Sequence, residues 1–113
     1  MTKVKVTKLN NNITEIECDG HTGYGVSGED IVCSALSSIV QTAVLGVIAV
    51  AGVNASVTRD DHRGYLKLTI PSNIDDAQRH DTNVILETML CGIGDLYEGY
   101  SDFIELEVID NVY

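Results

Sequence analysis

The sequence predicts an α+β fold, a two-layer sandwich in which two helices pack on one β-sheet, with the element order ββαββαβ. Short runs in which apolar and polar residues alternate indicate half-buried strands, and two long apolar stretches with helical spacing indicate helices. The chain has 113 residues, 44% of them hydrophobic, and Pro71 is its one proline. This composition excludes a disordered or fibrous protein and predicts a single domain over residues 1–113.

The first predicted elements form a hairpin. Lysine and valine alternate over residues 3–6, and three asparagines at 10–12 indicate a turn, because Asn tolerates left-handed backbone angles. In the next run, residues 14–19, we expect Ile16 and Cys18 on the face opposite the carboxylates. A glycine-rich loop at 20–28 then leads into the first helix.

Residues 31–53 carry no charge, and the segment is long enough to span a bilayer. Its polar residues are spaced three to four apart and therefore form one narrow stripe on a helix. A lipid-facing span gains nothing from such a stripe, so we expect a mostly buried helix and no membrane association. The stripe consists of Ser34, Ser37, Ser38, Gln41 and Thr42.

The second half predicts two strands at 55–59 and 65–70, joined by a turn and ended by Pro71. A helix is expected to start near Asp75 and Asp76, since acids suit the positive end of the helix dipole, and to run to about Glu98. Gly92 and Gly94 weaken this helix and are candidates for a break. A last strand is expected at 102–109. The expected apolar side of the helix consists of Ala77, Ile85, Met89, Ile93 and Tyr97.

Charge narrows the possible partners. Seventeen acidic and seven basic residues give a net charge of −10, and after residue 73 Arg79 is the one Lys or Arg, against ten acids. Such a field disfavours phosphate, which argues against nucleic-acid binding, and it attracts a basic peptide or protein. Solubility alone is the simpler interpretation of the same charge.

The segment from His21 to Ser34 carries the candidate chemistry. His21 follows a predicted strand, and Cys33 lies near a helix start at Asp30, which is either the N-cap or the partner of Ser27 in a capping box. If Asp30 is the N-cap, Cys33 is the third helical residue and its thiolate is favoured by the helix dipole. An adjacent His can then exchange protons with it. From the residues alone, a buried Cys33 and a surface or capping His21 are the more common interpretations.

Three blocks of sequence resemble the family of ribosomal-processing cysteine proteases, the Prp family, in order along nearly the whole chain. The first block is the more specific, because many helix–strand pairs show patterns like the other two. The blocks are His-Thr-Gly-Tyr-Gly-x-x-Gly-Glu-Asp-Ile-Val-Cys-Ser-Ala-Leu-Ser-Ser from His21, Leu-Glu-Thr-Met-Leu-x-Gly from Leu86, and Tyr-x-Asp-Phe-Ile from Tyr100.

The resemblance implies roles for particular residues. His21 and Cys33 fall on the catalytic dyad of the family, and Asp30 falls on an acidic position that orients the His or caps the helix. Ser37 falls on a serine one turn beyond the nucleophile. The loop expected to cover the bound peptide contains Gly23, Tyr24, Gly25 and Gly28. The small departures, Thr22, Ser34 and Ser101, do not touch the dyad.

The resemblance also implies a substrate and an assembly. Members of the family remove a short N-terminal extension from the large-subunit ribosomal protein numbered twenty-seven, as homodimers without metal or cofactor. With three cysteines and no export signal, we expect reduced thiols and a cytoplasmic protein.

Two alternatives stay open. The acidic chain is also compatible with a non-catalytic factor that binds a basic ribosomal protein. A metal site built on Cys18-x-x-His21, with Cys33 or Cys91 added, has ligand-like spacing but lacks a second matching pair. We expect Cys18 and Cys91 in the core, and His62 and His80 in solvent.

Overall fold

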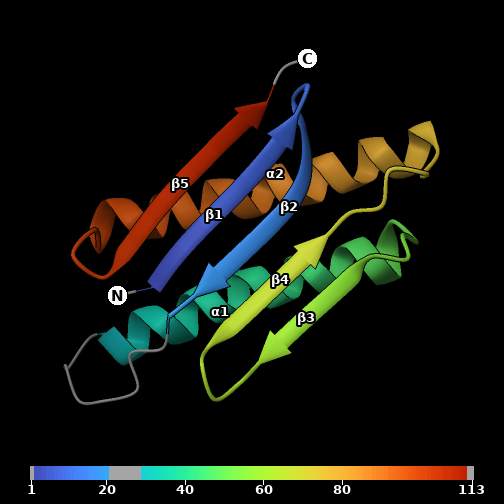
Figure 1. The fold of residues 1–113 in the computed structure, drawn as a ribbon. Helices are drawn as coiled ribbons and strands as arrows, with labels where there is room; N and C mark the ends of the chain where they lie inside the picture. Colours follow the sequence, from blue (N-terminus) through green and yellow to red (C-terminus); the bar gives the residue numbers. More distant parts are fainter. Residues whose placement is uncertain (1, 21–28, 112–113) are drawn as a thin grey trace.

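The structure is a computed structural model that describes residues 2–20 and 29–111. Within these residues it contains five strands, two α-helices and a short π-helical segment, η1, in the predicted order (Figure 1). Their bounds are β1 Thr2–Leu9, β2 Asn12–Asp19, α1 Glu29–Leu45, η1 Gly46–Val50, β3 Ser56–Asp60, β4 Tyr65–Thr69, α2 Asp76–Gly99 and β5 Ile104–Asn111.

The described strands form one mixed sheet in the order β3-β4-β2-β1-β5. The β1–β5 pair is parallel, whereas β1–β2, β2–β4 and β3–β4 are antiparallel. Both helices cover the same face of the sheet, and its other face is open (Figure 1). The predicted two-layer α+β sandwich is therefore confirmed. This arrangement places the start of β1, the end of β2 and the first turns of α1 next to one another.

The core fills the space between the sheet and the helices. Its fully buried side chains are mainly β-branched residues and leucines from β1, β2, β4 and α2, including Val6, Leu68 and Leu86. Asn10 and Asn11 form the predicted turn between β1 and β2, with φ of 52° and 67°. Such left-handed angles at both central residues match the twist of a two-residue hairpin.

The burial pattern of β2 departs from simple alternation. Ile16 and Cys18 are buried as predicted, but so is Ile13, which has the opposite parity. The pairing register with β1 shifts between Thr7 and Lys8, which lie opposite Glu15 and Ile13, so one β2 residue is left over. A bulge of this kind restores an inward direction for the next side chain, which explains how Ile13 reaches the core.

The first helix is less buried than expected. By length and composition, the span Ile31–Val50 could cross a membrane, and only 33% of its most apolar window is buried. The prediction of a mostly buried helix is therefore wrong: one face packs on the sheet, whereas Ile31 and Val50, 71% and 79% exposed, lie on the outside. A π-helical segment also ends the helix, which apolar periodicity alone does not reveal.

The second helix begins with a complete capping box at Asp75. The carboxylate of Asp75 accepts a bond of 2.7 Å from the Gln78 N–H, and the Gln78 side chain accepts from the Asp75 N–H at 3.1 Å. The helix continues through Gly92 and Gly94, so no break occurs there. Met89 and Ile93 are buried as predicted, but Ala77 and Tyr97 are exposed, because Thr82 and Leu86 set the inward face instead.

Candidate active site

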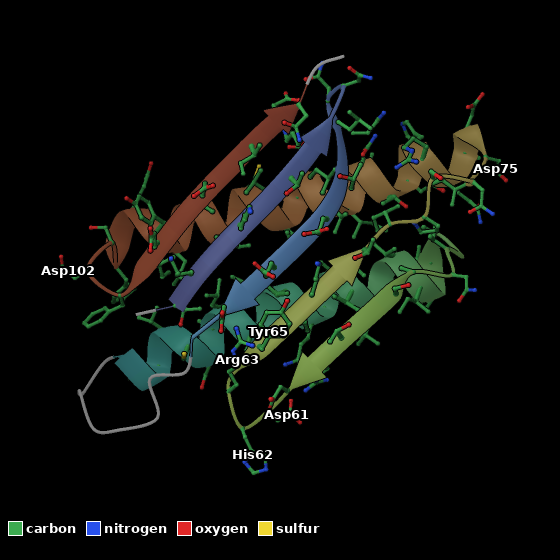
Figure 2. All side chains as sticks on the ribbon, viewed as in Figure 1. Asp61, His62, Arg63, Tyr65, Asp75 and Asp102 are labelled. Carbon is green, nitrogen blue, oxygen red and sulfur yellow. The ribbon has the colours of Figure 1, made fainter. Side chains whose placement is uncertain are left out.

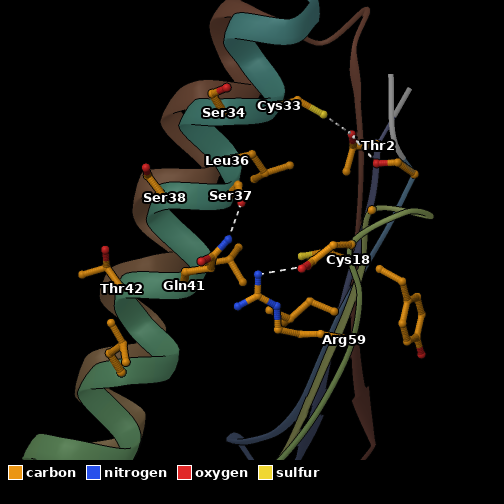
Figure 3. A pocket seen from close by; sticks show the side chains of 17 residues that line it. Thr2, Cys18, Cys33, Ser34, Leu36, Ser37, Ser38, Gln41, Thr42 and Arg59 are labelled. Atoms are coloured by element: carbon orange, nitrogen blue, oxygen red, sulfur yellow. Dashed lines mark hydrogen bonds and ion pairs between the residues drawn. The ribbon is translucent and has the colours of Figure 1, made fainter. Parts of the chain in front are cut away.

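Cys33 lies on α1, on the side that faces the sheet, and its thiol is partly exposed (Figure 3). The helix begins at Glu29, so Asp30 lies within its first turn rather than before it. The interpretation of Asp30 as N-cap is therefore wrong, and Cys33 lies one helical turn after the first helical residue. Helix-terminal charge effects fall off within one turn, so the helix start favours the thiolate less than predicted.

A pocket of about 620 Å³ opens in front of the Cys33 thiol. One wall is the sheet-facing side of α1, and the other comes from β1, the end of β2 and the hairpin of β3 and β4 (Figure 3). Hydroxyl and amide side chains line it beside apolar ones, a mixture that suits a peptide with both backbone and side chains. Its lining residues include Thr2, Cys18, Ser37, Gln41, Arg59, Tyr65 and Leu66.

Thr2 links Cys33 to the end of β2. The Thr2 hydroxyl lies 3.3 Å from the Cys33 sulfur and donates a hydrogen bond of 3.3 Å to the Gly20 carbonyl oxygen. Gly20 adopts a φ of 125°, an angle that glycine tolerates far better than other residues, and it directly precedes His21 in the chain. The residue next to His21 is therefore connected to the Cys33 thiol through one hydroxyl group.

Ser37 lies one turn after Cys33 and lines the same pocket, as the spacing predicts. Its hydroxyl oxygen accepts a 2.6 Å bond from the Gln41 side-chain amide (Figure 3). Since this bond fixes an exposed hydroxyl and leaves its proton available, Ser37 can donate to a peptide in the pocket.

Cys18 and Cys91 differ sharply from each other. Cys18 is 8% exposed, and burial, with a smaller contribution from the Glu17 charge, raises its pKa to about 12. It therefore stays a neutral thiol near pH 7, as expected of a core residue. Cys91 is exposed, so its predicted place in the core is wrong. Among the described residues, no three His, Cys, Asp or Glu side chains gather as metal ligands. The Cys18-x-x-His21 hypothesis involves a residue outside that part of the chain.

A charged network braces the far wall of the pocket. The Arg63 guanidinium donates to both Asp19 carboxylate oxygens, at 3.1 and 2.5 Å, and its carbon lies 4.5 Å from the centre of the Tyr65 ring (Figure 2). The Tyr65 hydroxyl donates to Glu17 at 2.6 Å. This bond, together with burial and the Glu17 charge, raises the pKa of Tyr65. The network joins the β3–β4 hairpin to the end of β2, immediately before Gly20.

The structure brings together only part of the predicted site. Cys33 and Ser37 share the pocket, and the backbone of Asp30 lies in the first turn of α1. The predicted dyad partner and loop, His21, Gly23, Tyr24, Gly25 and Gly28, lie outside the described residues. His62 and His80 are exposed, as expected. Thr2, Arg59 and Tyr65 were not predicted as site residues, because nothing in their local sequence distinguishes them from other strand residues.

Comparisons with known proteins give the same class of protein. The sequence model of the family described as "Cysteine protease Prp" matches residues 1–105. The ribosomal processing cysteine protease Prp of Staphylococcus aureus is 30% identical over 95 residues, which are 83% of this chain and 85% of that protein. Two crystal structures of the S. aureus protease also match, one with a substrate peptide and one with a covalently linked product peptide.

Both matches cover 96% of this chain and 99% of the S. aureus chain. The TM-scores are 0.83 and 0.81, with 26% and 27% sequence identity, respectively. A pocket beside a cysteine on this fold, together with these matches, defines a cysteine protease. The chain belongs to the Prp family of ribosomal-processing cysteine proteases.

Proposed function

We propose that this chain is an endopeptidase that removes the N-terminal extension of the large-subunit ribosomal protein numbered twenty-seven. Cys33 serves as the nucleophile and His21 as the general acid and base. One observation carries the proposal: the Cys33 thiol faces a peptide-sized pocket and is linked through Thr2 to the residue that precedes His21. The end of β2, which leads along the chain to His21, therefore meets α1 at one end of the sheet, and this supports the pairing of His21 with Cys33.

The proposed reaction has two steps. The Cys33 thiolate attacks the scissile carbonyl carbon, and the departing amine takes a proton from His21, leaving a thioester on Cys33. Water then attacks the thioester carbonyl carbon while His21 accepts its proton, the bond to the Cys33 sulfur breaks, and the Cys33 thiolate and protonated His21 are restored. The dipole of the first turn of α1 favours the negative charge that develops on the carbonyl oxygen.

The substrate assignment is supported by the family and by charge. The matched S. aureus protease binds a substrate peptide. A ribosomal protein is basic as a rule, and this chain carries a net charge of −10. We also propose a cytoplasmic homodimer without metal or cofactor. Exposed apolar side chains on α1 and η1, among them Ile31, Leu45 and Val50, are available for contact with a partner subunit. Sedimentation velocity of the purified chain tests the dimer.

Substitution of the nucleophile tests the activity directly. Cys33→Ala should lower cleavage of an extended ribosomal-protein peptide by about 10³-fold or more, because the thioester cannot form. The exposed Cys91 provides the matched control, since Cys91→Ala removes a thiol without touching the pocket. The readout is the mass of the peptide products after incubation with each variant.

The outcomes separate the enzyme from a binding factor. Full cleavage by Cys33→Ala would refute Cys33 as nucleophile. Binding of the precursor by the wild-type chain without any peptide product would favour the non-catalytic factor. His21→Ala should lose cleavage to a similar extent while the chain remains folded in circular dichroism, because His21 serves both proton transfers.

A further inference from the structure

The Thr2 hydroxyl on the sheet lies within hydrogen-bond distance of the Cys33 sulfur on α1. Thr2 is 6% exposed, and its Oγ1 atom lies 3.3 Å from both the Cys33 Sγ atom and the Gly20 carbonyl oxygen. Figure 3 shows the Cys33 side chain pointing from α1 toward Thr2 on the sheet. The contact joins β1 to α1, and the two residues that form it are 31 positions apart in the sequence.

The position of Thr2 is fixed by backbone and side chain alike. Its N–H donates to the Phe103 carbonyl oxygen at 3.0 Å, and it begins a central strand in which it lies opposite Ile104 of β5. A threonine side chain has few rotamers because two heavy atoms branch at Cβ. The oxygen of the hydroxyl is therefore held in place by the pairing of β1 with its neighbours and by the restricted side chain.

The Thr2 hydroxyl can form two different hydrogen-bond arrangements, one for each protonation state of Cys33. A threonine hydroxyl has one proton and two acceptor lone pairs. While Cys33 is a thiol, the proton of Thr2 goes to the Gly20 carbonyl, and the sulfur can donate its own weak hydrogen bond to the Thr2 oxygen. Once Cys33 is ionised, rotation of the hydroxyl about its C–O bond redirects the proton to the thiolate. Hydrogen bonds to ionised groups are stronger than neutral ones, so the second arrangement gains more.

We propose that Thr2 is a positioning residue that holds the Cys33 sulfur against the end of β2 and donates a hydrogen bond to it in the ionised state. Its consequence for catalysis rests on the proposed function, whereas the contact itself does not. Because Cys33 lies one turn inside α1, the helix start supports its thiolate only weakly, and a nearby hydroxyl donor adds to that support.

Other groups around the pocket also influence Cys33, but they are identical in every variant compared below. The titratable or charged groups that the structure describes there are Cys18 from β2, Arg59 from β3, Asp61 from the hairpin turn and Tyr65 from β4. Arg59 donates to Asp61 at 3.0 Å, so their charges largely offset each other. His21 is not among the described residues.

The test measures the ionisation of Cys33 without requiring proteolysis. Wild type, Thr2→Val, Thr2→Ala and Thr2→Ser are alkylated with iodoacetamide across a pH series, and peptide mass spectrometry follows Cys33 separately from Cys18 and Cys91. The readout is the midpoint pH of the rate profile, since a thiolate of higher pKa is intrinsically more nucleophilic and rates alone would mislead. Circular dichroism melting confirms that each variant is folded.

We expect Thr2→Val and Thr2→Ala to raise the midpoint by about half a unit to one unit, and Thr2→Ser, which keeps the hydroxyl, to stay close to wild type. An unchanged or lowered midpoint in both Val and Ala variants would overturn the proposal. Equal shifts in the Ser and Val variants would also overturn it, because they would indicate a packing role for the methyl group.

A parallel cleavage assay separates this inference from the proposed function. If the wild-type chain fails to cleave the ribosomal peptide but the midpoint shifts as expected, the function is wrong and the role of Thr2 stands. If the wild type cleaves and the midpoint does not move, the function stands and the role of Thr2 is wrong.

Discussion

Cys18 and Cys33 both line the pocket, yet their surroundings prepare them for different states. Cys18 belongs to the packed face of β2, where a thiolate would lose its solvation and lie close to the Glu17 carboxylate. Cys33 projects from α1 into the opening, beside a hydroxyl that can donate to it. The two thiols therefore differ in burial and in the polar groups beside them. Of the two, only Cys33 is suited to attack a peptide.

The buried Cys18 thiol should make the stability of the fold depend on pH in the alkaline range. Folding raises the Cys18 pKa from 9.0 to about 12, so the folded state keeps a proton that the unfolded state releases between these values. Stability should therefore be intact below pH 9 and fall as the pH rises toward 12, by at most about 1.4 kcal/mol per pH unit from this group.

Urea unfolding at pH 8.5 and pH 10.5 measures this effect. Cys18→Ala should lose about 2 kcal/mol less stability over the interval than wild type, since the group that drives the loss is gone. Cys91→Ala, which changes an exposed thiol, should behave as wild type does. Equal losses in Cys18→Ala and wild type would contradict the raised pKa.

At the scale of elements, the capping box of α2 should contribute measurably to the free energy of unfolding. Asp75→Ala removes the acceptor for the Gln78 N–H and should lower the free energy of unfolding by about 1 kcal/mol. Asp76→Ala is the matched control, because Asp76 lies in the first turn without serving as the cap, and it should cost only a few tenths of a kcal/mol. Urea denaturation of both variants decides, and equal losses would contradict the cap.

Two glycines within α2 are positions where a substitution should stabilise the chain, in contrast to the loss expected for the cap. A Cβ at Gly94 would meet nothing within 4 Å, so Gly94→Ala should stabilise the chain by about 0.5–1 kcal/mol through helix propensity. Gly92→Ala should give a comparable gain, since its Cβ would meet Ile39 at an ordinary 3.6 Å. Thermal melting measures both. A loss of stability in Gly94→Ala would show that the helix needs its flexibility at this point.

At the scale of the whole molecule, the acidic charge of the second half is only partly neutralised. On the open face of the sheet, Lys3 and Lys5 of β1 lie opposite carboxylates of β2 on one side and of β5 on the other. Lys8 of β1 also pairs with Glu87 of α2 at 2.8 Å. Much of the remaining excess lies on α2, whose carboxylates include Asp76, Asp81, Asp95 and Glu98.

This excess predicts a salt effect on substrate capture. Raising the salt from 50 to 500 mM shortens the screening length severalfold, so the KM for a basic ribosomal peptide should rise several-fold while kcat changes little. A neutral peptide with the same cleavage site provides the control and should show little change. A salt-independent KM for the basic peptide would show that the net charge of −10 serves solubility alone.

Much of this protein was predictable because the relevant signals are local. Alternation along the strands, the paired asparagines at 10 and 11, and the acids before α2 each act over a few residues, and together they predicted the element order and the sheet with two helices. The pair His21 and Cys33 was predicted from the resemblance to the Prp family, whose motif is continuous in sequence, and for His21, outside the described residues, it stays a prediction.

The sequence by itself determined the fold class, the family motif and the candidate nucleophile. Only the tertiary structure decided which face of α1 is buried, that a bulge turns Ile13 inward, and that Thr2 meets Cys33 across 31 residues. The physical reason is the range of the interactions. Periodicity shows that a helix or strand has an apolar face, but the residues that pack against this face depend on strand order and register. Those are set by the packing of the whole core, which no local pattern records.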